Sequence, residues 1–278
     1  MVVLRQNVFQ DYLIMVTGFK RYFKLIQNVR NPFAYWQDKF SPGKEVIFTT
    51  APNAINIRVP KRLFLIFKEI FLSDVYEIDS LKNELNENSI VVDIGANVGF
   101  FSFLVLSKVK VKKIFSFEPI PTNIKIFNQT ISENELVSTH IQLMQAAVTG
   151  SEQNGIELFL DGNNELTENA SVLPGFESTH SVKVSVPSIS FTKILKENNI
   201  QRVDFLKMDC EGSEFDIVYN TDPDQVKKVK KMIVEVHDVE GDPKNNITYF
   251  NSYLQSVGFE TKFERLSHRS HILVASRK

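Results

Sequence analysis

The chain has 278 residues, 43% of them hydrophobic and 23% charged, an ordinary globular composition that excludes a disordered or disulfide-scaffold protein. Its 32 Lys and Arg residues against 33 Asp and Glu residues give a net charge of -1, so no overall basic field exists to attract nucleic acid. The single cysteine, Cys210, excludes an internal disulfide and a multi-cysteine zinc site, and it favours a cytoplasmic location. The 23 Phe residues predict a core packed with phenyl rings.

Residues 1–45 are expected to form an N-terminal helical extension. Apolar residues from Val8 to Phe19 recur at helical spacing, and cationic residues follow them. This pattern suits a helix used for packing or for a homodimer. The alternative is weak peripheral contact with a membrane surface through residues 1–30. No apolar run approaches the roughly 18 residues of a transmembrane helix, so none is expected.

Residues 46–278 are expected to form one domain in which strands and helices alternate, which predicts a mostly parallel sheet with helices on both faces. A variable loop over about 150–180 interrupts the alternation, and an antiparallel hairpin closes the chain. The expected strands are 46–49, 55–59, 90–94, 113–117, 141–148, 182–186, 203–208, 231–236, 259–266 and 271–275, and the expected helices are 64–71, 100–107, 122–133, 213–219 and 247–256.

The segment Val91–Phe100, VVDIGANVGF, combines a buried strand, a glycine turn and the start of a helix. Gly95 lets the backbone pass close to a ligand, and Gly99 lets the helix approach the sheet. The middle glycine of a dinucleotide fingerprint is absent, because Asn97 stands in its place. Asp93 puts a carboxylate at the strand end, which repels a diphosphate and suits a cationic ligand. S-adenosylmethionine, a nucleoside with an ammonium and a sulfonium, is such a ligand; a nicotinamide site and a purely structural turn are the alternatives.

The next predicted strand ends in Phe117-Glu118-Pro119. Glu118 lies 23 residues after Gly95, where an acidic side chain can accept hydrogen bonds from both ribose hydroxyls. Asn123, which opens the following helix, either contacts the cofactor or supports that helix.

A third group of polar residues follows the strand that ends near Asp209, with Glu211 and Glu214 around a glycine turn. Ligands of open α/β sheets bind at the carboxyl ends of strands. Carboxylates clustered there are costly unless they are paired, hydrated, metal-bound or used in chemistry. Lys207 is a candidate partner for one of them, and Glu214 is expected to cap the helix that follows.

At the end of strand 231–236, Glu235 and His237 alternate onto one face. His237 is a candidate general base because its pKa lies near neutrality, and Asp238 is expected to orient it. A structural hydrogen-bonding role for His237 is the alternative. Glu235 and Asp238, with Asp209, could instead hold Mg²⁺, since hard oxygen ligands suit that ion.

Taken in order, the motifs VVDIGANVGFFS, FSFEPIPTN, VDFLKMDCEGSEFDIV and MIVEVHD resemble the FkbM family of S-adenosylmethionine-dependent methyltransferases over about residues 60–240. The resemblance implies an α/β class I methyltransferase fold, Rossmann-like, with a mostly parallel seven-stranded sheet and a C-terminal antiparallel hairpin. It implies that the first motif surrounds the methionine part of the cofactor and that Glu118 holds the ribose. The expected cofactor-binding residues are Asp93, Gly95, Asn97, Gly99, Phe100, Glu118, Pro119, Asn123 and Asp209.

The resemblance also implies O-methylation of a sugar, glycan or natural-product hydroxyl. In-line displacement at the sulfonium methyl needs an aligned acceptor oxygen and a base for its proton. His237 is the first choice of base, with Asp209 or Glu211 as the alternative, and residues 163–176 are a candidate lid. A nucleic-acid acceptor is not expected beside the acidic turn at Asp209. A non-catalytic S-adenosylmethionine-binding protein and an NAD-dependent oxidoreductase are the competing functions.

Overall fold

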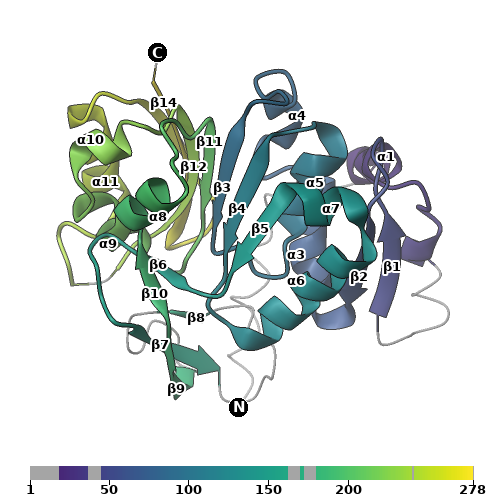
Figure 1. Cartoon of the computed structure of the whole chain (residues 1–278), viewed down its shortest axis with the longest axis horizontal. Helices are drawn as coiled ribbons and strands as arrows, with labels where there is room; N and C mark the ends of the chain where they lie inside the picture. The colour runs from purple at the N-terminus through teal and green to yellow at the C-terminus, as the bar shows by residue number, and fades with distance from the viewer. Residues whose placement is uncertain (1–18, 37–44, 162–169, 172–179, 240, 278) are drawn as a thin grey trace. The chain divides into compact units, whose positions relative to one another are not determined.

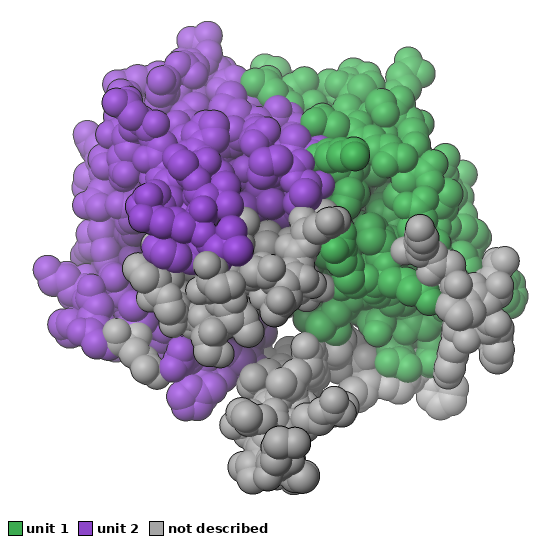
Figure 2. Space-filling model, turned by 90° about the horizontal axis from the view of Figure 1, so that it is seen from below, with its two compact units in different colours: residues 1–89, 97–114, 125–142 green, residues 90–96, 115–124, 143–278 purple. Residues whose placement is uncertain are grey.

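The computed structural model describes residues 19–36, 45–161, 170–171, 180–239 and 241–277 (Figure 1). The predicted lid at 163–176 therefore lies almost wholly outside the described residues, as does most of the variable loop. Two compact units make up the chain, and Figure 2 colours them separately. Unit 1 comprises residues 1–89, 97–114 and 125–142, and unit 2 comprises residues 90–96, 115–124 and 143–278.

A seven-stranded sheet, to which unit 2 contributes most of the residues, has the order β13-β14-β12-β11-β3-β4-β5 (Figure 1). β11 runs parallel to both β3 and β12, whereas β14 lies antiparallel to β12 and to β13. This is the strand order of a class I methyltransferase sheet, and it confirms the predicted fold and its C-terminal hairpin. The strands are β3 (Ile90–Ile94), β4 (Lys113–Phe117), β5 (Ile141–Met144), β11 (Phe205–Met208), β12 (Lys231–His237), β13 (Glu260–Arg265) and β14 (Ser270–Ser276).

The central strands form because their sequences are nearly continuous apolar runs, as expected for parallel strands covered on both faces. Their side chains pack with those of helices α8, α9 and α11 into the main core of unit 2. In this core the rings of Phe215 and Phe250 meet edge to face at 5.5 Å. The helices of this unit are α8 (Phe191–Glu197), α9 (Glu214–Tyr219), α10 (Pro223–Val226) and α11 (Ile247–Ser256).

The predicted strand 141–148 is in fact two strands, because the chain turns sharply at Ala146. The Ala146 N–H donates to Met144 O at 3.1 Å, and the Ala147 N–H donates to Pro187 O at 2.9 Å. The second half pairs with β10 outside the main sheet, and β7, β8 and β9 form a further small sheet. These strands are β6 (Ala147–Thr149), β7 (Ile156–Asp161), β8 (Ala170–Ser171), β9 (His180–Val186) and β10 (Ser188–Ser190).

In unit 1, phenyl rings form much of the core, as the composition predicts. Phe67 stacks on Phe48 at 4.5 Å and on Phe71 at 4.6 Å, and Phe100 meets Phe67 edge to face. Helix α1 belongs to this unit, where Lys24 pairs with Asp74 at 3.2 Å. Unit 1 contains α1 (Phe19–Asn28), β1 (Glu45–Thr49), β2 (Asn56–Pro60), a 3-10 helix (Lys61–Leu63), α3 (Phe64–Lys68), a π-helix (Glu69–Ser73), α4 (Ile78–Leu81), α5 (Phe100–Lys108), most of α6 (Pro121–Glu133) and α7 (Glu135–His140).

Within the described residues, no helix has both the length and the apolar character needed to cross a bilayer.

Candidate functional site

The carboxyl ends of β3 and β11 come so close together that only glycine fits at position 95. Gly95 has φ of +72°, and a Cβ placed on it would lie 1.7 Å from the carbonyl oxygen of Asp209. The backbone at Gly95 therefore passes close to that of Asp209, the residue that follows β11. Gly99, with φ of +89°, is packed against the ring of Phe127 on α6 and not against the sheet. Both glycines are required by packing.

Asn97 and Phe100, two further residues of the predicted cofactor set, belong to unit 1. Asn97 has φ of +50°, and its Oδ1 accepts a hydrogen bond from the next amide, Val98 N–H, at 2.8 Å. The side chain of Phe100 is 2% exposed, within the phenyl cluster of that unit. In this structure Phe100 therefore serves packing.

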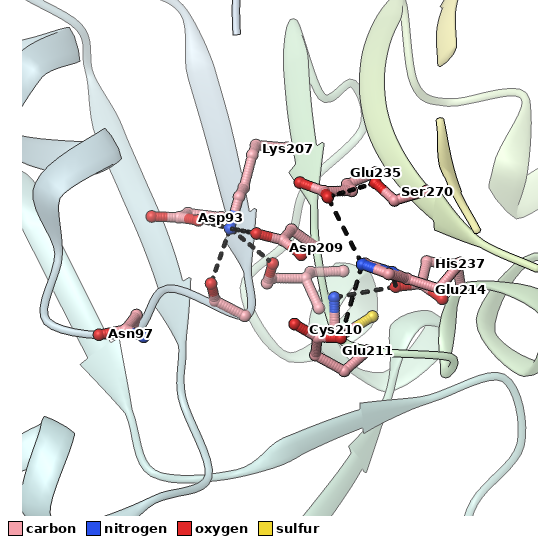
Figure 3. A network of polar contacts seen from close by, with 12 residues as sticks. Asp93, Asn97, Lys207, Asp209, Cys210, Glu211, Glu214, Glu235, His237 and Ser270 are labelled. Atoms are coloured by element: carbon pink, nitrogen blue, oxygen red, sulfur yellow. Dashed lines mark hydrogen bonds and ion pairs between the residues drawn. The ribbon is translucent and has the colours of Figure 1, made fainter. Parts of the chain in front are cut away.

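Asp93 has no exposed surface, and its charge is balanced inside the protein by Lys207. The Lys207 Nζ lies 3.6 Å from Asp93 Oδ1 and 3.7 Å from Asp209 Oδ2, and it donates to Gly95 O at 2.7 Å (Figure 3). Burial lowers the pKa of Lys207, but Asp209 and Asp93 outweigh it and leave that pKa raised. Lys207 is thus a cationic partner of Asp93 within the protein, and this ammonium ties the ends of β3 and β11 together.

Beyond β11, the turn at 209–212 presents two carboxylates at the edge of the sheet. Asp209 is 26% exposed at its side chain and Glu211 is 21% exposed, while the Glu214 side chain is fully buried. Glu211 has a left-handed backbone, with φ of +52°. This turn brings the two predicted catalytic carboxylates to the surface while keeping them beside buried charges.

His237, at the end of β12, lies between three carboxylates (Figure 3). Its Nδ1 is 3.3 Å from Glu214 Oε1, and its Nε2 is 3.5 Å from both Glu211 Oε2 and Glu235 Oε1. Ser270 on β14 donates to the same Glu235 oxygen at 2.6 Å. The structure therefore brings His237 together with Glu211 and Glu235, as the sequence predicts, and adds Glu214.

The charges around His237 set its protonation state. Burial alone would lower the pKa of His237, but the carboxylates of Glu211, Glu214 and Glu235 raise it well above the ordinary value. Burial raises the pKa of Glu211 to about 8; His237 opposes this effect, and the neighbouring carboxylates reinforce it. Burial would also raise the pKa of Glu235, but hydrogen bonds from His237 and Ser270 lower it. The surrounding carboxyl groups therefore favour the imidazolium form of His237.

Asp238 does not orient His237, contrary to expectation, because successive side chains of a strand point to opposite faces. Its Oδ1 accepts the Ile247 N–H at the start of α11 at 2.7 Å, and its Oδ2 lies 3.8 Å from His271. The orienting carboxylate on His237 is instead that of Glu214. The expectation that Glu214 caps α9 is also wrong, since it binds the turn that precedes this helix.

The same alternation means that the predicted Mg²⁺ ligands, Asp209, Glu235 and Asp238, are not brought together. Among the described residues, Asp209, Glu211 and His237 form the group whose possible ligand atoms lie within 4.8 Å of one another. That set includes an imidazole nitrogen, whereas Mg²⁺ prefers oxygen ligands. The residues present do not fit a Mg²⁺ site.

At the end of β4, Glu118 is held in place by two donors. The Ile120 N–H donates to Glu118 Oε1 at 2.9 Å, and the Asn123 side-chain amide donates to the same oxygen at 3.3 Å. Asn123 therefore supports the carboxylate of Glu118. Pro119 lies between Glu118 and Ile120, whose amide makes the second contact. Such a fixed carboxylate is suited to accept hydrogen bonds from a diol.

The sheet order, the glycine turn after the first central strand and the acidic ends of the neighbouring strands define a class I methyltransferase. Residues 93–261 match the family model described as the methyltransferase FkbM domain. The chain belongs to the FkbM methyltransferase family.

Similar curated proteins are also named methyltransferases. Methyltransferase sdnD of Sordaria araneosa is 27% identical over 224 residues, which cover 72% of this chain and 83% of that protein. Methyltransferase 1 of Beauveria bassiana is 27% identical over 217 residues, covering 72% and 82%. Among solved structures, Methyltransferase FkbM from Methylobacillus flagellatus is similar with a TM-score of 0.44 and 14% identity, covering 77% of this chain and 54% of that one.

Sequence reasoning missed the role of two residues. The sequence predicts that Glu214 caps a helix, but its position two residues after Gly212 also lets its carboxylate reach back to the preceding amides. Ser270, which is hydrogen-bonded to Glu235, carries no local signal, because it reaches the site through the register of β14 on β12.

Proposed function

We propose that the protein transfers the methyl group of S-adenosylmethionine to a hydroxyl group of a small-molecule or glycan acceptor. The observation that carries this proposal is the pair of partly exposed carboxylates, Asp209 and Glu211, next to the Gly95 turn at the carboxyl ends of β11 and β3. Membership of the FkbM methyltransferase family supports the same reaction class.

In unit 2, the residues proposed to bind or support the cofactor site are those whose polar atoms are held in place by hydrogen bonds or ion pairs. Glu118, oriented by Ile120 and Asn123, is proposed to accept the two ribose hydroxyls. Asp93 is proposed to act through Lys207, which keeps the Gly95 turn against Asp209. When bound, S-adenosylmethionine supplies an electrophilic methyl group on a sulfonium.

For the acceptor, Glu211 is proposed as the general base. In this reaction the acceptor oxygen would form the new O–C bond as the C–S bond breaks, the sulfur would leave as a neutral thioether, and the acceptor's proton would pass to the Glu211 carboxylate. The sequence favours His237 as the base, but an imidazolium cannot accept a proton, and the raised pKa of His237 favours that form. Glu211, with a pKa of about 8, is matched to accept a proton at mildly alkaline pH, where its deprotonated form dominates.

Orientation is expected to contribute more than proton transfer. Holding the two reacting atoms in line can supply roughly 7–11 kcal/mol of the barrier, whereas a general base adds about 10²–10⁴-fold. The fixed turn at 209–212 and the closely packed strand ends suit an enzyme that works mainly by alignment.

The acceptor class follows from charge. Asp209, Glu211 and Glu235 disfavour an acidic acceptor or a nucleic acid, because phosphate or carboxylate groups would be repelled. We therefore propose a neutral sugar or natural-product hydroxyl in a cytoplasmic pathway. AMB antimetabolite synthetase AmbE of Pseudomonas aeruginosa, a relative at 22% identity over 72% of this chain and 11% of that protein, lends support to a natural-product setting.

Calorimetric titration with S-adenosylmethionine, and separately with NAD, tests the cofactor. The wild-type protein is expected to bind S-adenosylmethionine and not NAD. Glu118→Ala is expected to weaken binding about 10–100-fold, because charge-assisted hydrogen bonds contribute roughly 1.5–3 kcal/mol. Glu264→Ala, which removes an exposed carboxylate on β13, is the matched control and should bind like wild type.

Transfer of labelled methyl to neutral hexoses, deoxyhexoses and polyols then tests the acceptor class. Binding of NAD in place of S-adenosylmethionine would move the protein to the oxidoreductases. Binding of S-adenosylmethionine without transfer to any of these acceptors would favour a non-catalytic binding protein or another acceptor class.

A further inference from the structure

The turn that carries Glu211 has a backbone that needs external support. Glu211 and Gly212 are consecutive left-handed residues, with φ of +52° and +99°. The left-handed region is disfavoured for a residue that has a Cβ, so neighbouring contacts must hold Glu211 in it.

Glu214 supplies those contacts from the first residue of α9. Its Oε1 accepts the Cys210 N–H at 3.0 Å, and its Oε2 accepts the Gly212 N–H at 2.8 Å. These two amides flank Glu211 on either side. A single buried carboxylate therefore holds both ends of the backbone segment that positions the Glu211 side chain.

Glu214 also reaches the neighbouring strand. Its Oε1 lies 3.3 Å from Nδ1 of His237, whose other nitrogen faces Glu211 at 3.5 Å. Because Glu214 Oε1 contacts both the turn and the imidazole, it links the position of Glu211 to that of His237. The Glu214 side chain has no exposed surface, so it is placed to act through these neighbours and not on a substrate.

We propose that Glu214 is a positioning residue, which holds the left-handed turn under Glu211 and fixes the ring of His237 so that it faces Glu211. This inference rests on the proposed function, in which Glu211 is the base. Glu211 on the turn and Glu235 on the same strand also raise the pKa of His237. The pKa of His271 on β14 is lowered by burial first, against Asp238, and to a smaller extent by Arg265 and His237.

The test is Glu214→Gln, which keeps the size of the side chain but replaces one acceptor oxygen with a donor. Titration of the His237 ring by NMR is expected to show a pKa lowered by about one unit or more. Exchange of the Cys210 and Gly212 amides should accelerate. With the best neutral-hexose or deoxyhexose acceptor, kcat should fall up to about 10²-fold, as expected for a misplaced reacting group, with a smaller change in KM.

Asp216→Asn is the matched control in the same helix. Asp216 also accepts a backbone amide, that of Gly150 at 2.9 Å, and its other carboxylate oxygen accepts from the side chain of Asn220 at 2.7 Å. This variant is expected to lose stability while the His237 titration and kcat remain as in wild type.

A Glu214→Gln variant that titrates and turns over like Asp216→Asn would overturn the proposal. If Glu214→Gln does not fold, Glu214→Asp replaces it; the shorter side chain keeps the charge but cannot span both amides and His237. In that variant kcat should still fall, and an unchanged kcat with unchanged amide exchange would equally overturn the proposal. The NMR and exchange readouts need no acceptor, so they still decide the role of Glu214 if no hexose is methylated and the proposed function fails.

Discussion

Glu211 derives its proposed chemistry from its neighbours. Burial raises its pKa to about 8, while the adjacent His237 imidazolium limits that rise. A carboxyl group with an ordinary pKa would be a weaker base. One that is buried without a neighbouring cation would remain protonated. The left-handed backbone at this residue places the side chain among these groups.

We expect kcat/KM to increase with pH, with the midpoint of the increase near pH 8, because Glu211 must be deprotonated to accept the acceptor's proton. Glu211→Gln should remove this dependence and lower the rate about 10²–10⁴-fold, while binding of S-adenosylmethionine persists. A pH–rate profile of labelled methyl transfer measures both effects. The same rise with pH in the variant would show that another group is the base.

At the scale of elements, β12 separates two sets of polar contacts by the alternation of its side chains. Glu235 and His237 face the acidic turn after β11, and Asp238, one residue on, meets the start of α11. The pairing of β12 with β14 adds Ser270 to the first set and His271 to the second. One strand thus supports both the candidate site and the attachment of a helix.

Asp238→Ala is therefore expected to affect stability and not chemistry. Loss of the bond to the Ile247 amide should lower the free energy of unfolding by about 0.5–2 kcal/mol, as for a lost helix-capping side chain. Urea denaturation measures this loss, and calorimetry should show unchanged binding of S-adenosylmethionine. A His237 titration altered as strongly as in Glu214→Gln would contradict this separation of the two faces.

Across the whole molecule, a net charge of -1 conceals a local excess of buried acid. Carboxylates outnumber cations around the ends of β3, β11 and β12, which makes the folded state hold protons that the unfolded chain releases. The carboxylates are those of Asp93, Asp209, Glu211, Glu214 and Glu235, and the cations are Lys207 and His237.

This excess predicts that stability falls as pH rises from about 6.5 to 8.5. Glu211 and His237 both have pKa values raised in the folded state, so the folded protein binds more protons than the unfolded chain in this range. Urea denaturation at pH 6.5 and 8.5 should show the loss, and the double variant Glu211→Gln, His237→Gln should reduce it. A wild-type stability that increases over the same range would contradict these shifts.

Much of this arrangement could be predicted from the sequence. The apolar runs of β3, β4 and β12 and the helix α11 lie where periodicity places them, because a buried strand or helix needs a matching pattern of apolar residues. The break between β5 and β6 was missed, since the apolar run continues through Ala146 and only the pairing with Pro187 and β10 divides it.

The sequence by itself determined the fold class and the residues that follow each central strand, because parallel strands end at one edge of a sheet. Only the tertiary structure decided how those residues pair. Glu214 and His237 are 23 positions apart, and the register between strands brings their side chains together. Protonation depends on that proximity and on burial. The balance of burial against three carboxyl groups, which raises the pKa of His237 and favours Glu211 as the proposed base, therefore exists only in the folded chain.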